Sequence, residues 1–325
     1  MDHKTLLRSD IKIDQPRWDQ NTYLGRAKHF FAITNPLNLL CTNKELDEAR
    51  LVIEQYRKGK IIDETLTEDK LWRFKNIYDS AFHPDTGEKM YLIGRMSAQV
   101  PMNMAITGCM MTYYKTPAQT IFWQWFNQSF NAIVNYTNRS GDSPIPVSQL
   151  VKSYCFATSG ALLTALSLNS LAKRFPPLIG RFVPLSAVAA ANCVNIPMMR
   201  SSELSNGIAI EDENGEKIGY SKKMAKEAIS QVVLSRILMA APGMIIPPIV
   251  MDRLEKRGVL ARMPWISAPA QVLMCGISLT FATPLCCALF PQRKSVPIDH
   301  LEDEIQEYVR KTKSSCKIGY YNKGL

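Results

Sequence analysis

Long stretches without a charged residue dominate the second half of this chain. Four of them hold 18 to 30 residues each and are flanked on both sides by Lys or Arg, at 96–114, 153–172, 182–199 and 263–292. A fifth stretch, 237–251, reaches a comparable length only if Arg236 is included. A helix needs about 20 predominantly apolar residues to cross a bilayer. The sequence therefore predicts an all-α fold, a multi-span membrane protein with about five transmembrane helices.

Charge divides the chain into unlike parts. Residues 1–95 hold 16 Lys or Arg and 15 Asp or Glu, which is typical of a soluble region. We predict a small soluble helical head over 1–95, a transmembrane body over 96–292 and a soluble tail over 293–325. The alternative is a large soluble protein with buried core helices. That alternative explains poorly why Lys or Arg flanks each uncharged run.

Prolines interrupt the uncharged runs, and several of the membrane helices are therefore expected to be broken. The prolines concerned are Pro101, Pro184, Pro197, Pro242, Pro247, Pro248, Pro269 and Pro284. Each would cost about 3 kcal/mol in the interior of a soluble helix. In membranes such positions survive where neighbours or a cavity satisfy the freed backbone, and transporters place broken helices at binding sites. For any single proline, a simple packing kink explains its presence as well as a broken helix at a binding site does.

Capping signals predict two helices in the head. Thr42 with Glu45 and Thr65 with Glu68 both have the spacing of a capping box. The second helix should end near Pro84, because proline disfavours a helical residue before it. In the tail, Leu301, Ile305 and Tyr308 predict a short amphipathic helix.

A conspicuous turn joins the head to the first uncharged run. Its residues are His83, Pro84, Asp85, Thr86 and Gly87. Proline fixes φ, aspartate bonds locally and glycine allows positive φ, so the segment predicts a structural hinge. Asp-Thr-Gly is also the aspartic-protease triplet, but that chemistry needs two facing carboxylates and the chain has one such triplet.

The segment 116–138 is uncharged but two-faced. Phe122, Phe126, Phe130 and Ile133 share one helical face. Amides share another, and we take them as candidate substrate-binding residues: Gln124, Gln128, Asn131 and Asn135, with Asn103 of the preceding run. The segment could be an interfacial helix, a re-entrant hairpin or a sixth span lining a polar cavity.

Arg236 is the sixth candidate for substrate binding. Charged residues within a span are expensive and usually face a cavity or a partner. Near a helix end, however, arginine can extend to the membrane surface at little cost. The sequence leaves both readings open.

Other classes of function lack support in the sequence. The eight cysteines are scattered, mostly within apolar runs, and neither Cys-x-x-Cys nor zinc-like Cys/His spacing occurs. We expect no metal site, no cofactor and no catalytic residue, so the chain is not expected to be an enzyme. Nucleic acid is excluded as a partner because the net charge of +10 forms no continuous basic face with interleaved aromatics.

Several long segments resemble the sideroflexins, also called the tricarboxylate carrier family, most closely the animal branch with serine-transporting members. The segments lie in the family's order, at 16–20, 83–90, 93–104, 122–142, 177–184, 195–200, 282–292 and 321–325. The resemblance implies a mitochondrial inner-membrane carrier of serine, or of alanine, glycine or cysteine, that supplies one-carbon metabolism. Its partners would be the amino acid and the lipid bilayer.

Two other functions stay open beside amino-acid transport. A citrate carrier would want several Lys or Arg within the membrane, and Arg236 is the single candidate. A scaffold for respiratory or iron–sulfur assembly would use the head and tail as docking surfaces and transport nothing. For a five-span chain, the positive-inside rule predicts the head in the matrix and the C-terminus in the intermembrane space.

Overall fold

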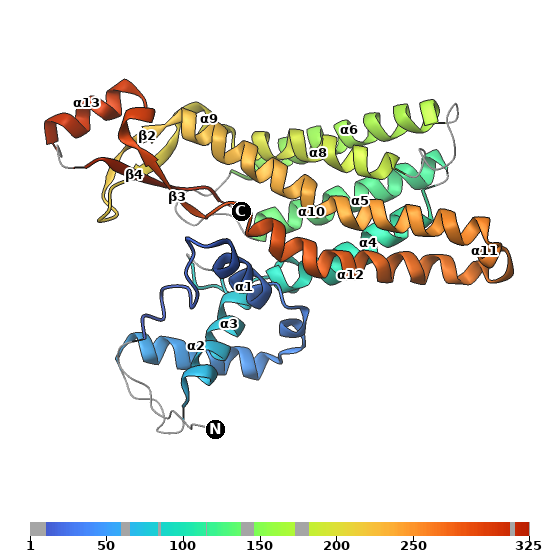
Figure 1. Cartoon of the computed structure of the whole chain (residues 1–325), viewed down its shortest axis with the longest axis horizontal. Coiled ribbons are helices and arrows are strands. Elements are labelled where there is room, and N and C mark those ends of the chain that lie inside the picture. Colours follow the sequence, from blue (N-terminus) through green and yellow to red (C-terminus); the bar gives the residue numbers. More distant parts are fainter. Residues whose placement is uncertain are drawn as a thin grey trace.

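Six long helices lie side by side in a bundle, with a helical head and a small sheet at one end of it (Figure 1). The computed structural model describes residues 11–59, 66–83, 86–114, 116–137, 146–172, 182–312 and 316–324. The bundle helices are α4 (Gln99–Thr112), α5 (Pro117–Thr137), α6 (Val147–Ala172), α8 (Val183–Met199), α10 (Lys222–Lys256) and α12 (Ser267–Cys287).

Three contacting pairs of bundle helices run antiparallel. The start of α5 bonds the end of α6, because Asn169 Nδ2 donates to Thr120 Oγ1 over 3.2 Å. The start of α6 bonds the end of α8, where Gln149 Nε2 donates to the carbonyl of Met199 over 2.8 Å. The end of α4 meets the start of α12, where Gln271 Nε2 donates to Thr112 Oγ1 over 2.9 Å. In the described residues the chain thus passes along the bundle six times, and α5 is one of these passes (Figure 1).

An even number of passes brings the head and the tail to the same end. Helix α1 of the head (Tyr23–Ile33) packs on the last turn of α12. Arg26 Nε donates to the carbonyl of Ala288 over 2.8 Å. The Tyr23 hydroxyl donates to the carbonyl of Leu285 over 3.3 Å. The structure thus places the head beside the end of α12, whereas the sides of a membrane on which the head and the C-terminus lie stay a prediction.

Two segments of the described chain are long and apolar enough to cross a membrane. They are α10 and the stretch Pro264–Cys287, which joins η4 (Pro264–Ile266) to α12, while α8 is apolar but shorter. The predicted count of about five spans is not reached by length and composition alone.

Contrary to the expectation from sequence, the prolines do not break the helices. Pro101, Pro184 and Pro269 lie in first turns, where the backbone needs no helical donor. Helix α10 continues through Pro242, Pro247 and Pro248 for 35 residues.

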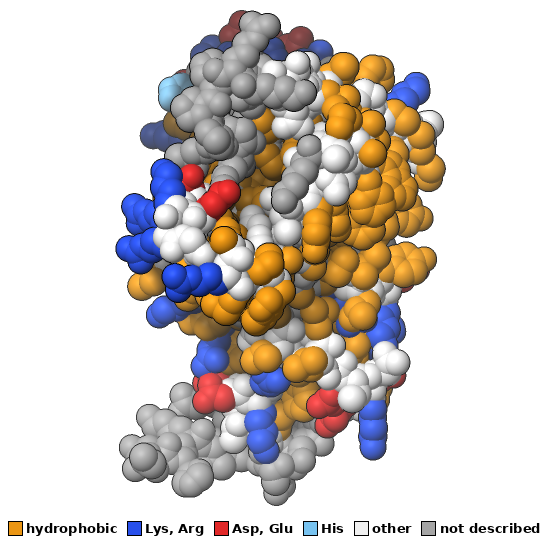
Figure 2. Space-filling model, turned by 90° about the vertical axis from the view of Figure 1, so that its right-hand side faces the viewer, with side chains coloured by type: hydrophobic (Ala, Val, Ile, Leu, Met, Phe, Trp, Pro, Cys, Tyr) orange, Lys and Arg blue, Asp and Glu red, His pale blue; other side chains and the backbone are white. Residues whose placement is uncertain are grey.

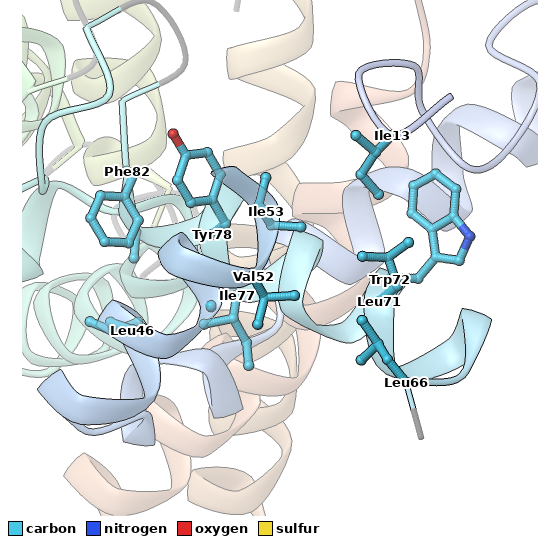
Figure 3. Close-up of a cluster of buried hydrophobic side chains, with 12 residues drawn as sticks. Ile13, Leu46, Val52, Ile53, Leu66, Leu71, Trp72, Ile77, Tyr78 and Phe82 are labelled. Atoms are coloured by element: carbon cyan, nitrogen blue, oxygen red, sulfur yellow. The ribbon is translucent and has the colours of Figure 1, made fainter. Parts of the chain in front are cut away.

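The head is built on two packed helices, α2 (Asn43–Arg57) and α3 (Glu68–Ala81). The predicted capping box of Thr42 and Glu45 is present. The second helix is capped by Thr67 rather than by Thr65, which lies outside the described residues. Figure 3 shows the side chains between these helices, which include Leu46, Ile53, Leu71, Trp72, Ile77 and Phe82.

A four-stranded antiparallel sheet corrects the all-α prediction. Its strands are β1 (Ile208–Glu211), β2 (Lys217–Ser221), β3 (Arg293–Pro297) and β4 (Ile318–Asn322), in the order β2-β1-β4-β3. The tail strands β3 and β4 thus join a hairpin from within residues 96–292. Helix α13 (Asp303–Thr312) covers the sheet with Ile305 and Val309, while Tyr308 is exposed. The division into three parts stays a prediction.

Short elements complete the described chain. They are η1 (Pro36–Leu40), η2 (Leu92–Gly94), η3 (Met96–Ala98), α9 (Ser201–Asn206), α11 (Val259–Arg262) and η5 (Ile298–His300). Helix α11 turns the chain from α10 into α12 at the end of the bundle away from the head (Figure 1).

Candidate functional site

Helix α5 turns its amides toward the inside of the bundle. Thr120, Gln124, Asn127 and Gln128 are all at most 5% exposed. Their spacing of four, three and one places them on one face of the helix. The row of polar side chains at these four positions is called the amide row below. Buried polar side chains cost free energy unless they are hydrogen-bonded, so their inward placement has to be explained.

The opposite face of α5 is apolar and exposed. Phe122 is 49% exposed, Trp125 47% and Phe126 39%. The outer faces of α6 and α12 are similar, with Phe156, Leu163, Ile277 and Phe281 exposed. Figure 2 shows hydrophobic side chains spread widely over one face of the molecule. Polar inside and apolar outside is the pattern expected of helices surrounded by lipid.

The amide row has atoms that lack partners. Gln124 Nε2 donates to the Tyr114 hydroxyl over 3.0 Å, but its Oε1 has no hydrogen-bond partner in the described part of the protein. Gln128 Nε2 is likewise unpaired there. An unpaired acceptor and an unpaired donor thus lie one helical turn apart. Leaving such groups buried costs about 1–3 kcal/mol each.

Neighbouring helices contribute further polar groups. Thr158 Oγ1 of α6 is buried without a partner among the described atoms. The Ser129 and Tyr154 hydroxyls are 3.0 Å apart and link α5 to α6. The polar seam therefore continues along the interface of these two helices.

The structure brings together only part of the predicted set. Gln124 and Gln128 share the amide row, and Asn131 is half-buried on the same helix. Asn103 bonds within α4, where its Nδ2 donates to the Gln99 carbonyl over 2.8 Å. The side chain of Asn135 lies outside the described residues.

Arg236 lies in different surroundings from the amide row. It is half-buried on α10 and within electrostatic range of Lys323, near the sheet end of the bundle. No hydrogen bond of the described structure joins it to Gln124 or Gln128. The role predicted for Arg236 in substrate binding therefore stays untested.

Thr120, Asn127, Tyr114 and Thr158 were missed from sequence. Thr120 and Asn127 carry a usable signal, since they lie four residues before and three after Gln124. Tyr114 follows α4 and Thr158 belongs to α6, and no local spacing reveals a contact of that kind.

The turn after the head has the predicted conformation at its glycine. Gly87 has φ of +66°, and its N–H donates to the His83 carbonyl over 2.9 Å. Thr86 N–H donates to His83 Nδ1 over 3.3 Å. Pro84 and Asp85 lie outside the described residues. The role of this turn as a hinge stays a prediction.

One open cavity of about 580 Å³ lies between the segment that follows this turn, the second half of α5 and the start of α6. Its lining is formed by Tyr91, Leu92, Ile93, Ala132, Ile133, Tyr136 and Leu150. These side chains are almost entirely apolar, so the cavity suits hydrocarbon rather than an amino acid. Within the described ranges, no group of three or more His, Cys, Asp or Glu residues is arranged to hold a metal ion.

Comparison with known proteins identifies the family. The sideroflexin family profile matches residues 12–325. Mouse Sideroflexin-1 is 61% identical over 97% of this chain and 98% of its own length. Human Sideroflexin-1 is 60% identical over 98% of this chain and 99% of its own length. Human Sideroflexin-3 is 59% identical over 97% of this chain and 98% of its own length. No solved structure matches the chain. The chain belongs to the sideroflexin family.

Proposed function

We propose that this protein carries a small neutral amino acid, with serine the first candidate, across the mitochondrial inner membrane. Membership of the sideroflexin family supports transport, and the inward amides of α5 support the type of substrate. One observation carries the proposal. Gln124 Oε1 and Gln128 Nε2 are buried without partners in the described structure, one turn apart on one helix face.

The chemistry of a zwitterion fits this pair. The substrate ammonium would donate to Gln124 Oε1, and the substrate carboxylate would accept from Gln128 Nε2. Side chains four residues apart on a helix lie about 6 Å apart at Cβ, within reach of both ends of one amino acid. The two partners would remove the cost of burying unpaired amide atoms.

Citrate is a weaker candidate for the same site. It carries close to three negative charges at neutral pH and would need several cations. Within the described amide row the four side chains are neutral, so little would offset the cost of desolvating such an anion. Alanine, glycine and cysteine keep both charged ends of serine, and they are the natural further substrates.

We further propose that all six bundle helices cross the bilayer. Helix α5 has 21 uncharged residues and a length of about 31 Å, which matches the hydrocarbon core of a membrane. Its exposed aromatic face supports contact with lipid. Six crossings would leave the head and the tail in the same compartment.

Uptake by purified protein in liposomes tests the function. Labelled serine, alanine, glycine, cysteine and citrate are offered separately, and protein-free liposomes set the background. We expect saturable uptake of serine and no uptake of citrate above background. A scaffold would give no flux with any substrate, and an enzyme would convert a substrate without concentrating it. Either result would overturn the proposal.

A further inference from the structure

Four cationic side chains lie near the place where the head, the bundle and the sheet join. Arg26 belongs to α1, Arg236 to α10, Arg200 follows α8, and Lys323 follows β4. Lys323 is only 2% exposed and Arg26 only 7%. The electrostatic environment of Lys323 is set in part by the other three. These four residues are called the junction cluster below.

Arg26 of the cluster is held by backbone carbonyls. Arg26 Nε donates to Ala288 O over 2.8 Å, and its Nη1 donates to Gln20 O and Asn21 O over 2.9 and 3.0 Å. These acceptors fix the guanidinium without neutralising it. The carbonyl of Lys323 likewise accepts from Arg200 Nη1 over 2.8 Å.

Only one carboxylate takes part in these contacts. Glu203 accepts from Arg200 Nε over 3.0 Å and pairs with its Nη2. Four positive charges thus face one negative charge in the described structure. Lys323 and Arg26 are buried, and Arg200 and Arg236 are half-buried. Such an excess favours a further anion, because desolvated charges are costly unless they are paired.

Lys323 is the least compensated member of the cluster. Its Nζ lies 5.8 Å from the centroid of the Phe290 ring, and in the described chain the ammonium has no hydrogen bond or ion pair. Burial, opposed by the nearby Cys287 thiol and assisted by Arg200, Arg236 and Arg26, lowers the pKa of Lys323 to about 8. No Asp or Glu is among the groups that shift it.

We propose that Lys323, Arg26, Arg200 and Arg236 form a binding site for a phosphate group. A phosphate carries up to two negative charges and several acceptor oxygens, so it can pair with several cations at once. Arginine suits such recognition because its planar fork donates two parallel hydrogen bonds.

The position of the cluster allows two sources of phosphate. It lies at the end of α12, where the apolar bundle gives way to the head and the sheet (Figure 1). In a bilayer this is the depth of lipid headgroups, so the phosphate of a phospholipid could enter from the side. A soluble phosphate could enter from the aqueous compartment. Either would tie the head, the bundle and the sheet together.

Thermal unfolding of the full-length protein tests the site. In one arm, delipidated protein in detergent is titrated with inorganic phosphate against chloride at equal ionic strength. In the other arm, the same delipidated protein in detergent is titrated with phosphatidylglycerol against diacylglycerol, which has the same acyl chains but no phosphate. We expect Tm to rise by about 5 °C in at least one arm, as binding to the native state alone requires. A rise in the first arm indicates a soluble phosphate, and a rise in the second arm alone indicates a lipid. No rise in either arm overturns the proposal.

Matched variants locate the effect. Lys323→Met keeps an unbranched chain but loses the charge, and it should abolish the rise in Tm. Lys217→Met removes an exposed lysine from the same sheet and should leave the rise unchanged. Equal rises in both variants would overturn the proposal.

The pH dependence of the wild type gives a second readout, which remains usable if Lys323→Met fails to fold. The bound phosphate favours the protonated ammonium, whose pKa in the free folded protein is about 8. Affinity for phosphate should therefore fall as pH rises above 8, by up to about tenfold per pH unit. A constant affinity between pH 7 and 9.5 would remove Lys323 from the site.

Discussion

The Cys275 thiol of α12 donates to the carbonyl of Gly243 on α10 over 3.1 Å. That carbonyl lies four residues before Pro247, which has no N–H to give it. The thiol from the neighbouring helix therefore replaces the missing donor. This contact helps to explain how α10 stays continuous through a proline that the sequence suggested would break it.

Cys275→Ala should lower stability, because it leaves the Gly243 carbonyl buried without a donor. The expected loss is about 1–2 kcal/mol. Cys275→Ser keeps a donor and should lose less. Thermal unfolding of the purified variants measures both. Cys193→Ala is the control, since Cys193 is exposed on α8. An equal loss in the alanine and serine variants would show that packing, and not the donor, matters at this position.

Helices α4 and α12 approach each other closely at Gly108. A Cβ built there would lie 2.6 Å from the Cα of Val272, so part of the backbone would have to move. Gly108→Ala should therefore destabilise the bundle by about 1–3 kcal/mol, the usual range for overpacking. Gly160→Ala is the control, because its nearest neighbour would be a Val194 methyl at 3.7 Å. Unfolding temperatures that fall equally in the two variants would contradict the close approach.

The helices of the bundle could be predicted because the absence of charge is a local property of the sequence. The sheet was missed for the opposite reason. Strands β1 and β2 do carry a local signal, Asn214-Gly215 between short apolar segments, which is typical of a hairpin. Strands β3 and β4, however, find their place by pairing, and Glu211 meets Tyr320 from more than 100 residues away.

The candidate site shows the same limit. The amides of α5 were found from their spacing, but which face points inward depends on what surrounds the bundle. In water Phe122 and Phe126 would be buried and the amides exposed, whereas the structure has the reverse. The junction cluster was missed because its members come from four distant segments, and Arg236 alone stood out by lying within an apolar run.

Gly87→Val should damage the turn that leads into the bundle. The positive φ of +66° is poorly tolerated by a β-branched residue, and the expected loss of stability is about 1–2 kcal/mol. Space is not the cause, since the nearest atom to a Cβ would be the Tyr78 hydroxyl at 3.8 Å. Glu88→Val, at the next and exposed position, is the control. Unfolding temperature and the membrane-inserted fraction are both measured. Normal values for Gly87→Val would contradict the strained turn.

Tags at the two ends of the chain test the number of membrane crossings. The proposed six crossings would leave an N-terminal tag and a C-terminal tag in the same compartment, and the contact of Arg26 with the end of α12 supports this. Protease is added to intact mitochondria, to mitoplasts and to detergent-lysed mitoplasts. Both tags should disappear at the same step. Loss of one tag at an earlier step than the other would restore an odd number of crossings.

Gln128→Leu should separate transport from folding. The leucine removes the unpaired Nε2 donor from a position that is 3% exposed, so stability should stay equal or rise. Uptake of serine should fall by about tenfold or more, because the substrate carboxylate loses a hydrogen bond worth about 1.4 kcal/mol. Gln124→Leu should act similarly on the ammonium side, at the cost of the bond to Tyr114.

The control for these two variants is Phe126→Leu, which changes the exposed face of the same helix. It should leave both uptake and Tm near wild type. Purified variants in liposomes give the uptake, and unfolding in detergent gives the stability. If Gln128→Leu and Gln124→Leu were inserted normally and still carried serine at the wild-type rate, the amide row would be structural and the substrate would have to bind elsewhere in the bundle.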